Sequence, residues 1–226
     1  MPFQDLAERV VEVRERIAAA AARGGGQRVS IVAVTKTHGV DAVRAAWEAG
    51  VRDVGENRVQ EALRKIETSD VPVNWHLIGH LQRNKVKSLD HFFLVHSIDS
   101  VRLADAVSEH GLARGRPVDA LLQVNVAGEA TKGGYAPNDL PGEAERLAGR
   151  SGIRVLGVMT MAPFGAEERV LRVVFGGARR AREVLASAGH PATELSMGMS
   201  DDYEVAAEEG ATMVRLGTVL FGRRPE

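Results

Sequence analysis

The hydrophobic residues of this chain repeat at two spacings, one typical of the buried side of a helix and one typical of buried strands. Near the N-terminus five apolar residues lie three or four positions apart, which places them on one side of a helix. These residues are Phe3, Leu6, Val10, Val13 and Ile17. They predict a helix over residues 3–22, ended by the glycines at 24–26. Residues 29–34 follow as a run rich in β-branched side chains, which predicts a buried strand.

From residue 29 to residue 216, strand patterns alternate with helix patterns. Strands are predicted over residues 29–34, 51–54, 73–78, 92–96, 118–126, 153–159, 192–196 and 212–216. Helices are predicted between them, over residues 41–49, 57–67, 82–89, 100–113, 139–149, 166–188 and 201–209. Such alternation predicts parallel strands joined by right-handed crossovers, as in an open doubly wound sheet or a closed (β/α)8 barrel.

The length of the chain favours the barrel. Eight predicted strands within 226 residues suit a closed barrel, which commonly takes about 250 residues. No linker rich in Pro, Gly or Ser divides the sequence into two parts. We therefore predict a (β/α)8 TIM barrel with an extra N-terminal helix, forming one domain over residues 1–226.

Composition and charge argue against several classes of function. The 29 basic and 30 acidic residues give a net charge of −1, which provides no global field for nucleic acid or for an anionic membrane. The absence of cysteine excludes disulfides, thiolate nucleophiles and cysteine metal ligands. The sequence has neither a run of about 18 apolar residues nor the features of a signal peptide at its start. We therefore expect a cytoplasmic protein that binds neither nucleic acid nor membranes.

Polar residues after the predicted strands define a candidate site, because the carboxyl ends of barrel strands share the face that holds the active site. Two glycine-containing loops follow the last two strands, at residues 195–200 (LSMGMS) and 215–218 (RLGT). Glycine lets the backbone approach a phosphate, and a following helix N-terminus attracts its charge. These loops predict a phosphate site built by Ser200, Gly217 and Thr218. The alternative is that Ser200 only caps the next helix and Gly217 only forms a turn.

Lys36 ends the first predicted strand, on the same face as these loops. Partial burial lowers the pKa of a lysine so that its amine can attack a carbonyl, and a phosphorylated aldehyde would suit such a site. Arg215 lies two residues before Gly217 and therefore deeper in the mouth. Beside the pyridine nitrogen of pyridoxal 5′-phosphate (PLP), an arginine would keep that nitrogen unprotonated and weaken the ring as an electron sink. The alternatives are a solvated Lys36 and an Arg215 paired with a carboxylate such as Glu56.

The histidines do not predict a metal site. His76, His80, His91 and His96 lack the cysteine or carboxylate spacing that marks a zinc site. His76 lies within a predicted strand, so a role in the core or in support of a site suits it better.

Eight stretches of the sequence, taken together, resemble one known family. They are AVTKT (33–37), GENRVQEAL (55–63), WHLIGHLQRNK (75–85), HSIDS (96–100), QVNVAGEATKGG (123–134), GVMTM (157–161), LSMGMSDD (195–202) and VRLGTVLFG (214–222). They occur in order over nearly the whole chain and resemble the pyridoxal phosphate homeostasis protein family. Members of this family are similar to the barrel of alanine racemase.

The resemblance implies PLP as the cofactor, held as a Schiff base on Lys36. It also implies phosphate contacts from Ser200, Gly217 and Thr218, with Arg215 near the pyridine nitrogen. The remaining positions carried over from the family are those lining the ring, Asn57, His76 and Met199.

By the same resemblance, the protein would carry or buffer PLP in vitamin B6 and amino-acid homeostasis, with no established catalysis. PLP-dependent apo-enzymes would be its transient partners, and we expect a monomer or a weak dimer. The sequence departs from the family at Thr35, where serine is common, and after Lys36, where the family often has a proline. Both departures concern the shape of the loop and leave the amine in place.

The alternative is a PLP-dependent racemase-type enzyme. Racemisation needs an acid/base group on each face of the substrate carbanion, and alanine racemase takes one of them, a tyrosine, from a second domain. We expect no such domain here, and neither Tyr135 nor Tyr203 is an evident replacement. A barrel that binds a different phosphorylated metabolite is a third hypothesis.

Overall fold

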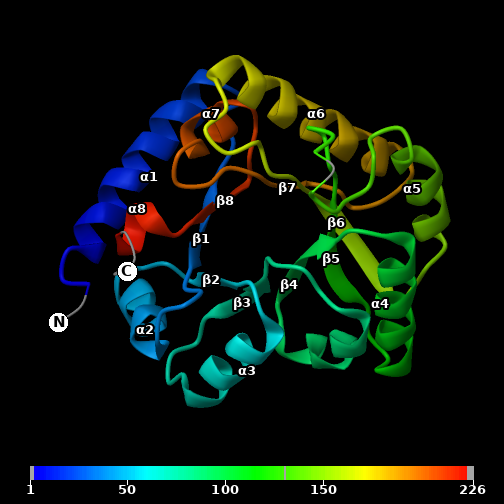
Figure 1. Ribbon diagram of the computed structural model, residues 1–226, viewed down its shortest axis with the longest axis horizontal. Coiled ribbons are helices and arrows are strands. Elements are labelled where there is room, and N and C mark those ends of the chain that lie inside the picture. The colour runs from blue at the N-terminus through cyan, green and yellow to red at the C-terminus, as the bar shows by residue number, and fades with distance from the viewer. Residues whose placement is uncertain (1–2, 130, 223–226) are drawn as a thin grey trace.

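The computed structural model describes residues 3–129 and 131–222, which form a closed parallel barrel (Figure 1). Each strand is parallel to the next in chain order, and β8 pairs with β1 to close the ring. The strands are β1 (Ser30–Val34), β2 (Asp53–Glu56), β3 (Asn74–Leu77), β4 (Leu94–Ile98), β5 (Val118–Gln123), β6 (Ile153–Met159), β7 (Glu194–Ser196) and β8 (Met213–Leu216). The predicted (β/α)8 TIM barrel is confirmed.

Helices surround the barrel on its outside (Figure 1). They are α1 (Leu6–Arg23), α2 (Val40–Glu48), α3 (Val59–Thr68), the 3-10 helix η1 (Arg83–His91), α4 (Val101–Ala113), α5 (Leu140–Ala148), α6 (Glu168–Ser187), α7 (Tyr203–Glu208) and α8 (Thr218–Phe221). Within residues 3–129 and 131–222, no helix is both long enough and apolar enough to cross a bilayer.

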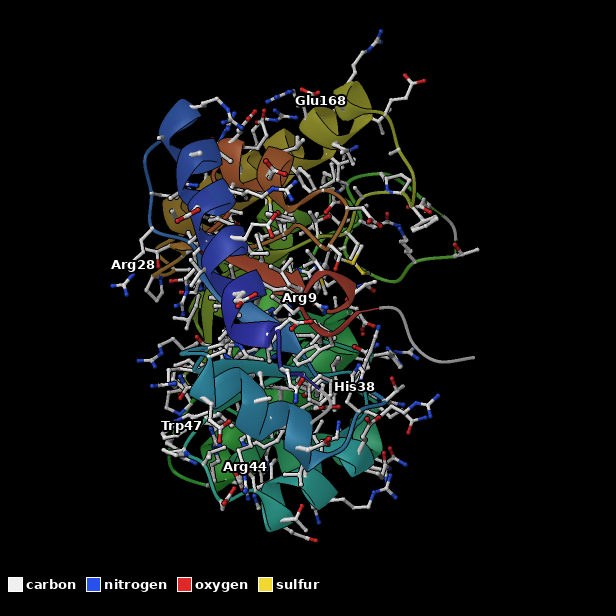
Figure 2. The ribbon with its side chains drawn as sticks, turned by 90° about the vertical axis from the view of Figure 1, so that its left-hand side faces the viewer. Arg9, Arg28, His38, Arg44, Trp47 and Glu168 are labelled. Carbon is white, nitrogen blue, oxygen red and sulfur yellow. The ribbon has the colours of Figure 1, made fainter. Side chains whose placement is uncertain are left out.

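The extra N-terminal helix α1 buries the side that its apolar spacing predicted, including Leu6, Val10, Val13 and Ile17. It contacts α2, α7 and α8, so it covers the barrel where the last strand meets the first. The side chain of Arg9 donates to the carbonyl of Leu220 in α8 at 3.1 Å, which ties the N-terminal helix to the C-terminal one (Figure 2).

The predicted bounds agree with the structure to within three residues, and three differences have a clear physical reason. The helix predicted over residues 82–89 is the 3-10 helix η1, whose buried Val86 and Leu89 lie three positions apart and so match its three residues per turn. The strand predicted over residues 92–96 begins two residues later at Leu94, because Phe93 is exposed before the barrel wall. The helix α8 was missed, since its four residues continue the apolar run of β8 and only Gly217 separates the two.

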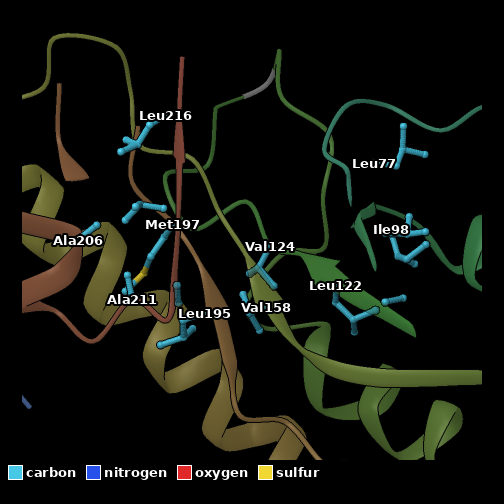
Figure 3. Packing of buried hydrophobic residues seen from close by; sticks show 14 of the residues in the cluster. Leu77, Ile98, Leu122, Val124, Val158, Leu195, Met197, Ala206, Ala211 and Leu216 are labelled. Carbon is cyan, nitrogen blue, oxygen red and sulfur yellow. The ribbon is translucent and has the colours of Figure 1, made fainter. Parts of the chain in front are cut away.

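The larger hydrophobic core fills the layer between strands and helices. Figure 3 shows part of it, with Leu122, Val158 and Leu195 extending from β5, β6 and β7. A smaller apolar cluster lies inside the barrel and contains Val32, Leu94, Leu121, Met159 and Met213. Strand side chains alternate between these two sides. Several of the interior positions carry polar side chains, among them His76, His96, Ser196 and Arg215.

Candidate functional site

A cavity of about 730 Å³ lies at the mouth of the barrel, where the strands end. Its lining comes from the residues that end or follow the strands, as expected for the active face of such a barrel. Seven of the eight residues proposed from the sequence line it together: Lys36, Asn57, Met199, Ser200, Arg215, Gly217 and Thr218. The eighth, His76, is not among the lining residues.

The two glycine loops after β7 and β8 meet at the mouth. The hydroxyl of Ser200 accepts a hydrogen bond from the backbone N–H of Val219, in the first turn of α8, at 3.2 Å. Ser200 does not cap α7, because that helix begins at Tyr203 and the loop is closed instead by Asp202, whose Oδ1 accepts from the Met199 N–H at 2.6 Å. Ser200 is therefore not the cap of the helix that follows it, and its hydroxyl joins this loop to α8 instead.

Gly198 gives the first of these loops its shape. Its φ is +95°, and a Cβ at this position would lie 2.6 Å from the side chain of Ala206 in α7. Any other residue would both strain the backbone and push the helix away. The glycine therefore lets the loop turn close to α7 and brings Ser200 to the cavity.

Arg215 is a buried cation at the inner end of the cavity, with 5% of the residue exposed. Its Nη1 donates to Ser196 Oγ at 2.7 Å and its Nη2 donates to the carbonyl of Thr160 at 2.9 Å. Burial lowers the pKa of Arg215 to about 10, still well above neutral pH, so the guanidinium stays charged. Within residues 3–129 and 131–222, no carboxylate lies within ion-pair distance of it. Asp202 acts on this charge only from beyond ion-pair distance, so the buried guanidinium suits an anionic or electron-rich ligand.

The alternative pairing of Arg215 with Glu56 is wrong. Glu56 ends β2 with its side chain in the helix layer behind the wall of the barrel, where Lys65 of α3 donates to its Oε1 at 2.6 Å. Because strand side chains alternate between the two sides of the wall, Glu56 and Arg215 lie on opposite sides of it.

A hydrogen-bonded chain continues from Arg215 into the barrel. Ser196 Oγ lies 2.8 Å from His96 Nδ1, and His96 Nε2 lies 2.8 Å from His76 Nδ1. His76 Nε2 in turn lies 3.1 Å from Asp53 Oδ1 at the start of β2. The chain therefore crosses the interior of the barrel from its mouth to the opposite end.

The two ends of this hydrogen-bonded chain have fixed directions. An arginine can only donate and a carboxylate can only accept, so Ser196 Oγ accepts from Arg215 and His76 donates from Nε2 to Asp53. In the order in which each imidazole donates once, the Ser196 hydroxyl donates to His96 Nδ1 and His96 donates from Nε2 to His76. Burial lowers the pKa of His96 well below its ordinary value, in agreement with a neutral ring.

These hydrogen bonds place His76 in a different position from the one expected. The family resemblance placed it beside the ring, whereas its imidazole is 1% exposed, below the cavity, and bonded to His96 and Asp53. The physical reason is that both ring nitrogens are satisfied inside the barrel, which leaves none to face the mouth.

Two polar residues at the ends of β4 and β5, Ser97 and Asn125, shape the loops around the mouth. Ser97 Oγ donates to the carbonyl of Gly79 at 2.6 Å. The amide of Asn125 donates to the carbonyls of Glu129 and Lys132. Neither residue lines the cavity.

The sequence reasoning missed several residues at the cavity. His38, His80, Asp99 and Lys132 line it, and His80 Nδ1 lies 3.0 Å from Asp99 Oδ2. His80, Asp99 and Lys132 fall within stretches of family resemblance, which was the available signal. Ser196 was missed because a single serine beside Leu195 and Met197 gives no pattern of its own.

The fold and cavity define the alanine racemase type of barrel. Residues 10–225 match the family model described as alanine racemase, N-terminal domain. An alanine racemase from Corynebacterium glutamicum superposes with a TM-score of 0.77 at 14% identity, over 99% of this chain and 62% of that one. At this identity the likeness concerns the fold alone.

Closer relatives narrow the family. A pyridoxal phosphate homeostasis protein from Pseudomonas aeruginosa is 45% identical over 223 residues, which are 97% of this chain and 96% of that protein. PipY from Synechococcus elongatus, solved with PLP bound, superposes with a TM-score of 0.85 at 37% identity, over 96% of this chain and 100% of that one. The chain belongs to the pyridoxal phosphate homeostasis protein family.

Proposed function

We propose that this protein binds PLP in the cavity at the barrel mouth and carries or buffers it in vitamin B6 and amino-acid homeostasis. The observation that carries the proposal is the convergence of Lys36, Arg215 and the two glycine loops on one cavity. The PLP-bound relative PipY and the name of the curated relatives support the choice of ligand.

The residues present suit each part of PLP. The phosphate would be held by Ser200, Gly217 and Thr218, whose loops are already joined by the Val219 hydrogen bond. The buried charge of Arg215 would face the pyridine nitrogen, while Asn57 and Met199, which line the cavity, would flank the ring. His76 would act only from below, through the chain that supports Arg215.

Lys36 would hold the cofactor covalently. The cofactor would supply an aldehyde, and Lys36, which lines the same cavity, would supply the amine that bonds its carbon. Such a bond would form with the loss of one water molecule, and water could hydrolyse it again. Such a reversible bond suits a protein that both keeps and releases its cofactor.

Two observations favour a carrier over a racemase. Arg215 has only donors to offer, so a pyridine nitrogen beside it must accept and stay unprotonated, which weakens the ring as an electron sink. Both tyrosines of the chain are buried away from the cavity: Tyr135 donates to Glu143 at 2.8 Å, and Tyr203 is 2% exposed. Neither can reach a substrate carbanion as an acid/base group.

An absorbance titration tests the proposal. PLP is added to the purified protein, to Lys36→Ala and, as a matched control, to Lys87→Ala at an exposed lysine of η1. We expect the visible band of a protein Schiff base in the wild type and in Lys87→Ala and its loss in Lys36→Ala. A wild type that stays colourless at saturating PLP would refute the proposal.

A transfer assay tests the carrier role. The PLP-loaded protein is mixed with a PLP-dependent apo-enzyme, whose recovery of activity is compared with that given by the same concentration of free PLP. We expect the apo-enzyme to regain activity more slowly than with free PLP, at a rate set by the release of PLP from Lys36. We further propose that the protein is cytoplasmic and a monomer or weak dimer, and sedimentation measures its mass in solution.

A further inference from the structure

Behind the wall of the barrel, beside Lys36, lies a buried group of charges that the proposed function does not use. We propose that Lys65, Glu56 and Glu61, called here the Lys65 cluster, are positioning residues that hold the backbone on both sides of Lys36 and so set its readiness to bond the cofactor. The inference rests on the proposed function, in which Lys36 is the cofactor lysine.

Lys65 is the centre of the cluster. It lies on α3, and its side chain is 8% exposed. Its ammonium donates to Glu56 Oε1 at 2.6 Å, to Glu61 Oε1 at 2.9 Å and to the carbonyl of Thr35 at 2.8 Å. Because an ammonium has three N–H donors, these contacts satisfy Lys65 completely. One of the three is the backbone of the residue before Lys36.

The cluster also holds the residue after Lys36. Glu61 Oε1 accepts the backbone N–H of Thr37 at 2.6 Å. The hydroxyl of Thr35 donates to Glu56 Oε1 at 2.5 Å. Both neighbours of Lys36 are therefore bonded to one ammonium, either directly or through a single carboxylate.

The backbone held in this way is in an uncommon conformation. The carbonyl of Thr35 accepts the N–H of His38 at 3.1 Å, which closes a four-residue turn with Lys36 and Thr37 at its centre. Thr37 has a φ of +70°, a left-handed conformation that glycine usually supplies in turns and that is strained for a β-branched residue. Strain of this kind persists only where surrounding contacts impose it. The contact from Thr37 to Glu61 is such a constraint.

Stability of the fold is a weak explanation for the cluster. A buried ion pair is often no more stabilising than apolar side chains of the same volume, because its charges must be removed from water. The second oxygen of Glu56, Oε2, is buried with no hydrogen-bond partner within the described residues, which adds to that cost. The Lys65 cluster contacts both neighbours of Lys36. The free-energy cost of burying its charges is therefore better explained by a role in positioning that lysine.

The test separates positioning of Lys36 from binding of the rest of the cofactor. Glu61→Ala removes the acceptor of the Thr37 N–H, whereas Glu61→Gln keeps an acceptor oxygen at the same distance. Schiff-base formation is followed by stopped-flow absorbance after PLP is added, and the adduct is trapped with borohydride. Affinity for pyridoxine 5′-phosphate, which has no aldehyde, reports non-covalent binding alone.

We expect Glu61→Ala to slow Schiff-base formation by roughly 10- to 100-fold, the usual cost of a displaced reacting group. Affinity for pyridoxine 5′-phosphate should change by less than about twofold, and Glu61→Gln should retain most of the rate. Adding Thr37→Gly to Glu61→Ala should restore part of the rate, because glycine adopts this φ without strain. A merely structural role would not be rescued in this way.

Two further variants complete the design. Lys65→Met removes the ammonium and should slow the reaction at least as much as Glu61→Ala. Glu194→Ala is the matched control: Glu194 is a half-buried carboxylate at the opposite end of the barrel that accepts from Thr212 Oγ1 at 2.6 Å. It should alter the melting temperature and leave the rate unchanged.

The outcomes distinguish this inference from the proposed function. If the wild type forms no borohydride-stable adduct at Lys36, both are overturned. If the wild type forms the adduct and Glu61→Ala forms it at the same rate, only the positioning role is overturned. An equal loss of rate in Glu194→Ala would also overturn it, because the effect would then follow from general destabilisation.

Discussion

Two buried polar regions border the cavity, and they differ in both charge and placement. The Lys65 cluster lies outside the barrel wall, contains full charges, and contacts the backbone around Lys36. The chain from Arg215 to Asp53 lies inside the barrel, has two imidazoles between its guanidinium and its carboxylate, and holds the side chain of Arg215. The Lys65 cluster therefore holds the backbone on both sides of Lys36, whereas Ser196 and the carbonyl of Thr160 hold Arg215 by its own guanidinium nitrogens.

The largest effect on stability is expected from Ser196→Ala on the arginine side. The substitution leaves an N–H donor of Arg215 and the Nδ1 of His96 without partners in the interior, which should cost roughly 2–4 kcal/mol in unfolding free energy. Urea denaturation measures it. Ser97→Ala is the control, since that hydroxyl serves only the Gly79 carbonyl and should cost about 1 kcal/mol. Equal losses of unfolding free energy in the two serine variants would show that the hydrogen-bonded chain from Arg215 to Asp53 adds no stability beyond that of a single buried hydrogen bond.

A smaller effect is expected from Thr35→Val on the lysine side. The buried hydroxyl is lost, but Glu56 Oε1 keeps its bond from Lys65, so the cost should be about 1 kcal/mol. Thr160→Val is a matched loss of a buried hydroxyl that donates to the Val124 carbonyl at 2.8 Å. We expect similar losses of stability in the two variants, with slower Schiff-base formation only in Thr35→Val. Slower Schiff-base formation in both variants would show that the Lys65 cluster has no particular effect on Lys36.

The smallest expected effects are changes of stability with pH, and they have opposite signs for Asp53 and Glu56. Desolvation acts to raise the pKa of Asp53, but hydrogen bonds from His76 and Asn74 outweigh it and lower the pKa. Its stabilising contribution is therefore present above the ordinary pKa of an aspartate and is lost as pH falls through the lowered value. Burial raises the pKa of Glu56 despite the bond from Lys65, so protonation favours the folded state and stability from this group rises as pH falls.

Unfolding free energies measured between about pH 3 and pH 7 check these signs. As pH falls, the difference between wild type and Asp53→Asn should shrink, whereas the stability of the wild type relative to Glu56→Gln should rise. Each change should be about 1 kcal/mol or less. The same sign for both variants would contradict the assigned environments.

Much of the fold was predictable because it depends on local periodicity. The alternation of apolar residues located the strands, and the 3–22 pattern identified the buried side of α1. Periodicity failed for α8, where the apolar residues of Thr218–Phe221 continue those of β8. One glycine changes the direction of the chain there, and a hydrophobic pattern does not record it.

The site was predictable as far as it depends on strand ends. Residues that follow parallel strands must meet at one mouth, and this brought Lys36, Ser200 and Gly217 together. The partners of a buried side chain depend instead on register and on which side of the wall it faces. The sequence could therefore neither pair Glu56 with Lys65 nor place His76 below the cavity.

The central claim, a covalent bond between PLP and Lys36, is tested most directly by peptide mapping. The protein is loaded with PLP, reduced with borohydride and digested with trypsin. We expect a reduced adduct that blocks cleavage at Lys36, so that the modified peptide spans residues 29–44, and no modified peptide from Lys36→Ala. An adduct found only at other lysines, or none at all, would contradict the claim.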